Sequence, residues 1–480
     1  MHLHNSNISE FHSSLYQLPS IEIIDLRFNP LKYIDLSNGL WNLRQLYLDY
    51  CNLTELKLFN ATLSNIEVLT VSGNSITDID FRDVLMPRLR IFEAKNTAIK
   101  SFNFKNCNLS ILTQMTLDGS PITSFELGPG VPGLKYLNLR ATKLTSLYLD
   151  NSSVPALRSI SLDNSSISRL YLASRVQKVT LKHTKLTVFD TRKLDIPMLT
   201  FLDISSSLIK EIDLSKGMDH LNDLFAKSTK LFNFNSSKYP LPSLTNLVLS
   251  NSPVRVLNLG GAPNIQYVHA NYANLSQFNS TGYLLPYIKT LRLSHNPLQV
   301  LDIREGLEQV QTLFLKNTSL LRFDKTVANL PNLNTLRISG TRLKYIDISY
   351  FPKLRLLNVI GSPSLQKIHF DYKKSKVFAN LQIDRESLIC DCEWLNILKE
   401  RHFSFSAQMC KGGQSRDTAV SIATKLGCNS VDNNSQITLS SATTPTTKTI
   451  TSTTMLHKPT TMLFPWVWNN SKLIFKYYWS

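Results

Sequence analysis

Apolar residues recur along most of this chain in the pattern L-x-x-L-x-L-x-x-N-x-L-x-x-L-x-L, where x is mostly polar. Residues 21–36, 66–81 and 288–303 fit the pattern throughout. Its first apolar position recurs every 19–23 residues and gives sixteen copies, which start at residues 21, 43, 66, 89, 112, 134, 157, 176, 199, 221, 244, 265, 288, 310, 333 and 354. Such a period predicts a solenoid that grows coil by coil, whereas length alone suggests about three domains.

Each copy predicts one short strand, x-L-x-L-x. Alternate side chains of a strand point to opposite faces, so the leucines enter a core and the x residues face outward. The next apolar pair turns the chain and covers the convex side. Stacked copies then form a parallel sheet on the concave side, in which the strands of neighbouring copies pair.

The polar position of the pattern predicts a ladder of buried side chains that bond to the backbone of neighbouring coils. It is Asn at residues 29, 74 and 296, and Ser or Thr in most other copies. A hydroxyl group satisfies fewer backbone groups than an amide does. Cys51 occupies this position in the second copy, where we expect a small buried thiol.

A second period of about 45 residues lies over the first. Even-numbered copies often carry Phe after the ladder position, at Phe102, Phe189, Phe234, Phe278 and Phe323. Odd-numbered copies more often carry an aliphatic–Asp–aliphatic sequence, as in residues 212–214. The outward residue two places before the ladder alternates in step, with Lys95, Arg140, Lys182, Lys227, Asn271 and Lys316 in even copies and Asp118, Asp163, Ser205, Ser250, Ser294 and Ser339 in odd copies. We therefore expect a two-copy unit.

Four cysteines lie close together near the end of the repeats, at Cys390, Cys392, Cys410 and Cys428. Their spacing lacks the paired C-x₂₋₄-C of a zinc module and favours disulfides. Three pairings are open to four cysteines. The segment 440–454 is almost entirely Thr and Ser, which predicts an O-glycosylated stalk.

The repeat, together with Cys390-Asp-Cys392-Glu-Trp394-Leu395, resembles extracellular leucine-rich-repeat proteins of the Toll-like and adhesion-receptor type, over residues 3–428. The resemblance implies an α/β solenoid, a horseshoe with a parallel concave sheet and a disulfide-bonded cap. It also implies the pairs Cys390–Cys410 and Cys392–Cys428. The expected domains are the repeat array (1–370, a partial repeat then sixteen copies), the cysteine-rich C-terminal flanking cap (371–428), the stalk (429–461) and an aromatic tail without assignment (462–480).

The net charge of +17 is spread along the chain, with no run of five basic residues. Nucleic-acid binding needs a concentrated basic patch, so a protein or an acidic glycan is the expected ligand instead. No stretch reaches the 18–20 apolar residues of a membrane helix, although an anchor outside this sequence is an open alternative. The oligomeric state stays open.

We expect an extracellular or cell-surface location, because the disulfide cap requires an oxidising compartment. No signal peptide is visible and the chain opens inside a repeat, so we expect an incomplete N-terminus. The expected glycosylation sites in the array are Asn7, Asn52, Asn60, Asn108, Asn151, Asn164, Asn235, Asn274, Asn279 and Asn317.

No catalytic or phosphate-binding motif occurs, and we expect neither an enzyme nor a cofactor or metal. Exposed aromatic and Arg residues on the strands of copies 10–15 predict a binding surface. Its residues are Phe225, Lys227, Tyr267, His269, Tyr272, Arg292, His295, Phe314, Lys316 and Arg337, and a smaller cluster in the first copies contains Arg27, Phe28, Arg44, Tyr47 and Tyr50. The alternative for both sets is packing across the strands. A matrix component that self-assembles and an intracellular scaffold are the alternative functions.

Overall fold

The structure, a computed structural model, describes residues 1–411 with the exception of 16–17, 38–39, 57, 59–62, 80, 82–85, 104–108, 129, 217, 284, 372–376, 379, 391, 393 and 395–408. They belong to one compact unit, Met1–Asn429. The predicted stalk and aromatic tail lie outside the described residues.

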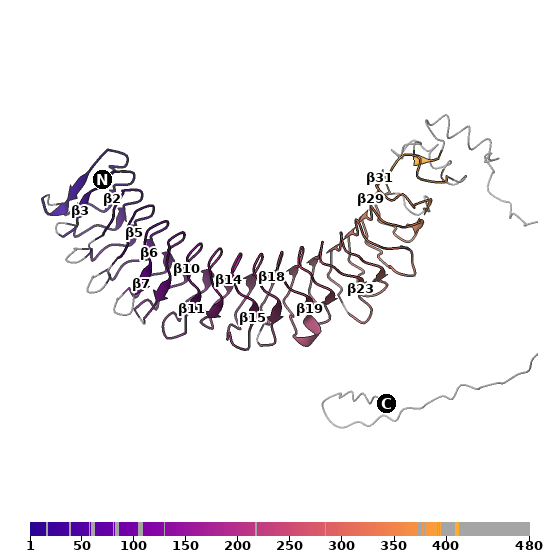
Figure 1. Cartoon of the computed structure of the whole chain (residues 1–480), viewed down its shortest axis with the longest axis horizontal. Coiled ribbons are helices and arrows are strands. Elements are labelled where there is room, and N and C mark those ends of the chain that lie inside the picture. Colours follow the sequence, from indigo (N-terminus) through magenta and orange to yellow (C-terminus); the bar gives the residue numbers. More distant parts are fainter. Residues whose placement is uncertain are drawn as a thin grey trace, which may run out of the picture. The chain divides into compact units, whose positions relative to one another are not determined.

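One long parallel sheet runs through this unit, with one three-residue strand per coil. Each strand pairs in register with the strands of the coils before and after it, and the middle residue of each is apolar and points inward. The strands lie on the inner side of the curved row of coils (Figure 1). They are β2 (Ile23–Asp25), β4 (Gln45–Tyr47), β5 (Val68–Thr70), β6 (Ile91–Glu93), β8 (Gln114–Thr116), β10 (Tyr136–Asn138), β12 (Ser159–Ser161), β14 (Lys178–Thr180), β16 (Phe201–Asp203), β18 (Asp223–Phe225), β20 (Asn246–Val248), β22 (Tyr267–His269), β24 (Thr290–Arg292), β26 (Thr312–Phe314), β27 (Thr335–Arg337), β29 (Leu356–Asn358) and β31 (Asn380–Gln382).

The last strand, β31, adds a coil to the sixteen copies. Leu381 of β31 pairs with Leu357 of β29, and Phe378 and Ile383 occupy the flanking apolar positions of the pattern. This strand lies in the range that sequence analysis assigned to the cap. The sheet therefore continues past residue 370.

Short strands and turns, with little helix, form the outer side of the coils (Figure 1). The pairs are β1 (Glu10–His12) with β3 (Tyr33–Asp35), β7 (Ser101–Asn103) with β9 (Ser124–Glu126), β11 (Ser146–Tyr148) with β13 (Arg169–Tyr171), β15 (Val188–Asp190) with β17 (Glu211–Asp213), β19 (Asn233–Asn235) with β21 (Val256–Asn258), β23 (Gln277–Asn279) with β25 (Val300–Asp302), and β28 (Tyr345–Asp347) with β30 (Lys367–His369). Two 3₁₀ helices complete this side, η1 (Ser13–Leu15) and η2 (Ser236–Lys238).

This outer pairing explains the alternation in the sequence. The Phe of an even copy lies opposite an aliphatic residue of the next odd copy in most pairs, as in Phe189 with Ile212 and Phe234 with Leu257, while Phe102 lies opposite Phe125. Except at β28 and β30, each short sheet joins an even coil to the odd coil after it. The predicted two-copy unit is confirmed as a pair of coils.

The ladder residues bond as their chemistry predicts. Asn74 is buried, its Oδ1 accepts the N–H groups of Cys51 and Leu53 at 3.0 Å, and its Nδ2 donates to two carbonyl groups, those of Leu48 and Val71. Thr142, in contrast, donates only to the Leu139 carbonyl, in its own coil. Cys51 is fully buried in this ladder, as predicted, and burial raises its thiol pKa to about 11.

The residue before each ladder position has a positive φ in all sixteen copies. Gly and Asn tolerate this conformation, whereas other side chains are strained in it. The row nevertheless contains Phe28, Tyr50, Tyr272 and His295, with φ between 54° and 59°. Two aromatic pairs therefore occupy strained positions along one rim of the sheet.

At the C-terminal end, Trp394 closes the core. Its side chain is 2% exposed, its ring lies 6.3 Å from that of Phe370, and its Nε1 donates to the Ile368 carbonyl at 2.6 Å. A disulfide joins Cys390 to Cys410, as the resemblance implied. Cys392 is also disulfide-bonded, while its expected partner Cys428 lies outside the described residues.

Candidate concave binding face

The central outward residues of six neighbouring strands, β18 to β27, form one row, which consists of Phe225, Val248, His269, Arg292, Phe314 and Arg337. The register places His269 beside Arg292, Arg292 beside Phe314, and Phe314 beside Arg337. All are half-buried except Arg337, which is exposed. The repeat therefore lines them up as one row, because each coil contributes the same position of its strand.

Arg292, Phe314 and Arg337 form a stack at the C-terminal end of this row. The guanidinium carbons of Arg292 and Arg337 lie 4.6 Å and 5.3 Å from the centre of the Phe314 ring. Both distances are within the range of a cation–π interaction, which holds the two guanidinium groups beside one aromatic ring. Nε of Arg292 is buried without a hydrogen-bond partner.

A second group lies along the rim, three residues further on in each coil. The rings of Tyr272 and His295 stack in parallel at 4.1 Å, and Nδ2 of Asn317 lies 3.2 Å from Nδ1 of His295. Tyr272 is 56% exposed. Burial, aided by the neighbouring Lys316, lowers the pKa of His295, so the ring is uncharged at neutral pH. Burial and Arg292 lower the pKa of His269 in the same way.

Three further predicted residues, Phe225, Lys227 and Tyr267, lie on the same face. Phe225 packs against Phe201 of β16, with ring centres 5.4 Å apart. Lys227 and Tyr267 are exposed. Phe201 belongs with this face although sequence analysis did not select it, and its outward position in a strand was the available signal.

A hollow on the flank of β10 to β16 is the other feature that sequence analysis missed. It is lined by Lys135, Arg158, Lys178 and Phe201 among others. Nζ of Lys178 lies 4.8 Å from the centre of the Phe201 ring. The central outward residues of these strands are small and polar, and the positive charge of the hollow comes from Lys135, Arg158 and Lys178 beside them.

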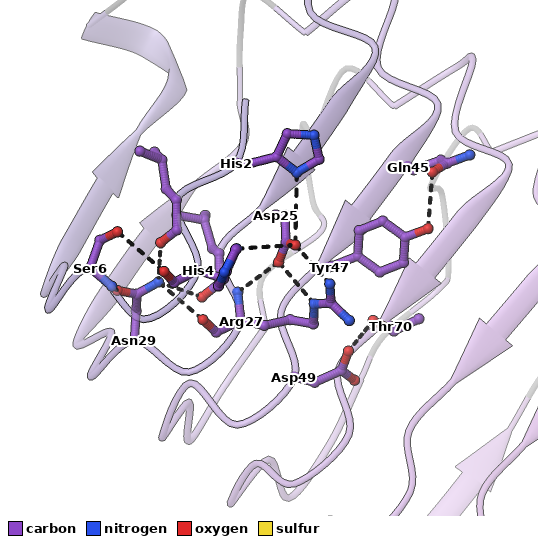
Figure 2. Close-up of polar contacts among 12 residues, drawn as sticks. His2, His4, Ser6, Asp25, Arg27, Asn29, Gln45, Tyr47, Asp49 and Thr70 are labelled. Carbon is purple, nitrogen blue, oxygen red and sulfur yellow. Dashed lines mark hydrogen bonds and ion pairs between the residues drawn. The ribbon is translucent and has the colours of Figure 1, made fainter.

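The predicted cluster in the first copies is largely committed to internal contacts (Figure 2). Arg27 forms a bidentate ion pair with the buried Asp25, through Nε at 2.9 Å and Nη2 at 2.7 Å, and its guanidinium lies 5.1 Å from the Tyr47 ring. This pair lowers the pKa of Asp25. The hydroxyl of Tyr47 donates to Gln45, and Asp49 accepts from Thr70 (Figure 2). Packing across the strands, the alternative considered for this cluster, fits these contacts.

Phe28 and Tyr50 are the exposed part of this end of the sheet. Their rings stack at 5.1 Å with an interplanar angle of 3°. The Tyr50 ring also covers Gly73, where an added Cβ would lie 2.4 Å from it. The two rings pack on the rim as a continuous stack.

The described part of the chain contains no group of three His, Cys, Asp or Glu residues that could hold a metal ion. None of the described helical segments is long and apolar enough to span a membrane. Of the expected glycosylation sites, Asn60 and Asn108 lie outside the described residues, Asn235 is half-buried and the others are exposed. Cys107 also lies outside the described residues.

Asn317 is an expected glycosylation site that touches the predicted binding set. Its Nδ2, the atom that would carry a glycan, is the atom in contact with His295. A glycan at this position and a ligand on the rim beside Lys316 would compete for the same space.

No protein-family model and no curated protein matches this chain. Solved structures do match its fold. A leucine-rich-repeat protein of Leptospira interrogans is similar with a TM-score of 0.55 at 17% identity, over 77% of this chain and 96% of that one. Toll in its complex with Spatzle from Drosophila is similar with a TM-score of 0.52 at 15% identity, over 77% of this chain and 55% of that one. This chain therefore has the leucine-rich-repeat fold.

Proposed function

We propose that this protein is a recognition or adhesion protein that binds a macromolecular ligand on the concave face of β18 to β27. The observation that carries the proposal is the stack of Arg292, Phe314 and Arg337. Arg and aromatic residues provide most of the binding energy in protein interfaces, and a rigid sheet holds them in place without an ordering cost.

An extracellular or cell-surface location fits this function. The Cys390–Cys410 disulfide requires an oxidising compartment. The segment around it acts as the cysteine-rich C-terminal cap, since Trp394 covers the end of the core. The exposed sequons Asn7, Asn151 and Asn279 are accessible to glycosylation. Among proteins of the same fold, Toll binds the protein Spatzle, and we propose a protein ligand here too.

The test is a binding screen of the full chain against an array of secreted proteins, ectodomains and glycans. Arg292→Ala with Phe314→Ala removes two residues of this stack, and Asn138→Ala with Arg140→Ala is the matched control on β10 and its coil. We expect a ligand that the first variant loses by about tenfold or more and the control retains. The melting temperature should not change, because Arg292 and Phe314 lie outside the core.

Two results would contradict the proposal. A ligand that both variants bind as tightly as the unmodified chain does not use this face. A ligand lost only by the control binds at the middle of the sheet, beside the hollow on β10 to β16.

A further inference from the structure

The outward residue two places before the ladder has a structural role in odd-numbered copies. In the odd copies from the third to the thirteenth, its side chain accepts the backbone N–H of the corresponding residue in the next coil. Asp118 accepts from Arg140, and Asp163 from Lys182, both at 2.9 Å. Ser205 accepts from Lys227 at 3.3 Å, and Ser294 from Lys316 at 3.1 Å. Asp and Ser therefore make the same hydrogen bond, but only Asp adds a negative charge.

From Ser205 onward the odd copies use only Ser, which changes the charge of the face. Before this point, Asp163 forms ion pairs with Lys182 at 3.4 Å and Arg140 at 3.8 Å. After it, Lys227 and Lys316 have the hydrogen bond to their backbone but no ion pair among the described residues. Asp and Ser both accept the backbone N–H of the next coil, so the hydrogen bonding of the sheet does not require the change to Ser.

The other outward positions of the concave strands also lose their acidic residues in the second half of the sheet. Acidic residues occur there up to β18, as at Asp25, Glu93 and Asp223. From β20 to β29 these positions contain no Asp or Glu, while their basic residues are Lys289, Arg292, Lys316, Arg337 and Arg355. None of these five forms an ion pair within the part of the chain that the structure describes. This half of the face therefore has a positive charge that the protein does not compensate.

We infer that the ligand presents carboxylate groups to Arg292 and Arg337 from an acidic segment of a protein partner. This inference rests on the proposed function and specifies its ligand. A guanidinium group matches a carboxylate in a two-point hydrogen bond, and neither Arg292 nor Arg337 has an ion-pair partner among the described residues. Phe314 between them provides an apolar contact for a neighbouring side chain of the partner.

The size of the charged centre favours a protein segment over a polyanion. Arg292 and Arg337 lie two strand spacings apart, about 10 Å. The central positions on either side hold the uncharged Val248 and Asn358, and burial keeps His269 uncharged. A nucleic acid or sulfated glycan is normally followed by a continuous basic track. A short acidic segment that presents carboxylates to Arg292 and Arg337, with an apolar residue between them over Phe314, fits the observed row better.

The hydrogen-bond equivalence of Asp and Ser supplies a matched pair of variants. Ser294→Asp keeps an acceptor for the Lys316 N–H and places a carboxylate two residues from Arg292, the spacing at which Asp25 pairs with Arg27. Asp163→Ser makes the opposite change in the first half of the sheet. Both variants keep the acceptor of the backbone hydrogen bond, and circular dichroism of each checks that it folds.

The experiment selects random short peptides from a display library on the full chain and measures the winners by fluorescence anisotropy. We expect peptides rich in Asp and Glu with an apolar residue between them. Ser294→Asp should weaken their binding roughly tenfold, which equals about 1.4 kcal/mol, and Asp163→Ser should change it less than twofold. A heparin oligosaccharide and a single-stranded RNA are the polyanion probes.

The outcomes separate this inference from the proposed function. Neutral or basic peptides that are lost on Arg292→Ala with Phe314→Ala, but not on Ser294→Asp, would overturn the acidic ligand and leave the binding face intact. Tighter binding of either polyanion, with the same dependence on Ser294→Asp, would overturn the protein segment. Peptides whose affinity changes in neither variant would contradict ligand binding on the concave face of β18 to β27.

Discussion

The asparagine ladder gives a prediction about stability that can be worked out from its hydrogen bonds. Asn296 is 2% exposed, its Oδ1 accepts the N–H groups of Ala273 and Leu275 at 3.0 Å, and its Nδ2 donates to the Ala270 and Leu293 carbonyls at 2.8 Å and 2.9 Å. Asn296→Ala leaves all four backbone groups without this partner. Each buried group left unsatisfied costs about 1–3 kcal/mol. Because the coils relax in part, we expect a total loss of about 3 kcal/mol.

The matched control is Thr318→Ala, at the ladder position of the next coil. Thr318 is also buried, but its Oγ1 donates only to the Leu315 carbonyl, at 3.0 Å. We expect a loss of about 1 kcal/mol. The assay is urea unfolding of the full chain followed by circular dichroism, with hydrogen exchange of the affected coils, because a repeat array can unfold in parts. Equal losses for the two variants would refute the reasoning that the amide connects two coils and the hydroxyl only one.

Three further predictions follow from single residues. The buried thiol of Cys51, with its pKa raised to about 11, should resist iodoacetamide at mildly alkaline pH, and rapid labelling seen by mass spectrometry of the folded chain would contradict its burial. Hydrogen bonds from Ser14 and Ser37 lower the pKa of Asp35 from 3.8 to about 2, so the carboxylate stabilises the fold fully above pH 3.8 and loses this effect as the pH falls towards 2. In a pH series of melting temperatures, Asp35→Asn should therefore reduce the fall in melting temperature between these pH values. The same fall in the variant and the unmodified chain would contradict this prediction. Gly73 has φ +70° and lies beneath the Tyr50 ring, whereas Gly361 has φ +72° and an added Cβ there would have its nearest atom 3.9 Å away. Gly73→Ala should therefore lower the free energy of unfolding by about 2 kcal/mol more than Gly361→Ala does. Equal unfolding midpoints would show that the Tyr50 ring moves aside freely.

Much of the fold follows from the sequence, because each coil repeats one local pattern. The spacing of the leucines places the strands of the concave sheet from β2 to β29, although it did not predict the short outer strands, and the chemistry of Asn, Ser and Thr accounts for the ladder bonds. The alternation of Phe and aliphatic residues predicts a two-copy unit, but not the outer sheets that join its two coils. β31 was missed, although the copy that begins at Phe378 starts 24 residues after Leu354, only one more than the longest spacing among the sixteen copies.

The candidate site was less accessible to sequence reasoning, since it depends on contacts between coils. The sequence shows that Arg292, Phe314 and Arg337 occupy the same position of their strands, but not that both arginines stack on the phenyl ring. It likewise shows Arg27 near aromatic residues, but not its ion pair with Asp25. The positive φ before each ladder position was visible only as a preference for Gly and Asn there.

The most direct test of the central claim is photo-crosslinking from the face itself. Phe314→benzoylphenylalanine replaces one aromatic ring by a larger photoreactive one on β26, and Asn138→benzoylphenylalanine is the control on β10. The full chain is irradiated on cells and in matrix, and its adducts are identified by mass spectrometry. We predict a partner captured from position 314 and absent at position 138, whose crosslinked segment is acidic. A partner captured equally from both positions, or only from position 138, would contradict a ligand-binding face on β18 to β27.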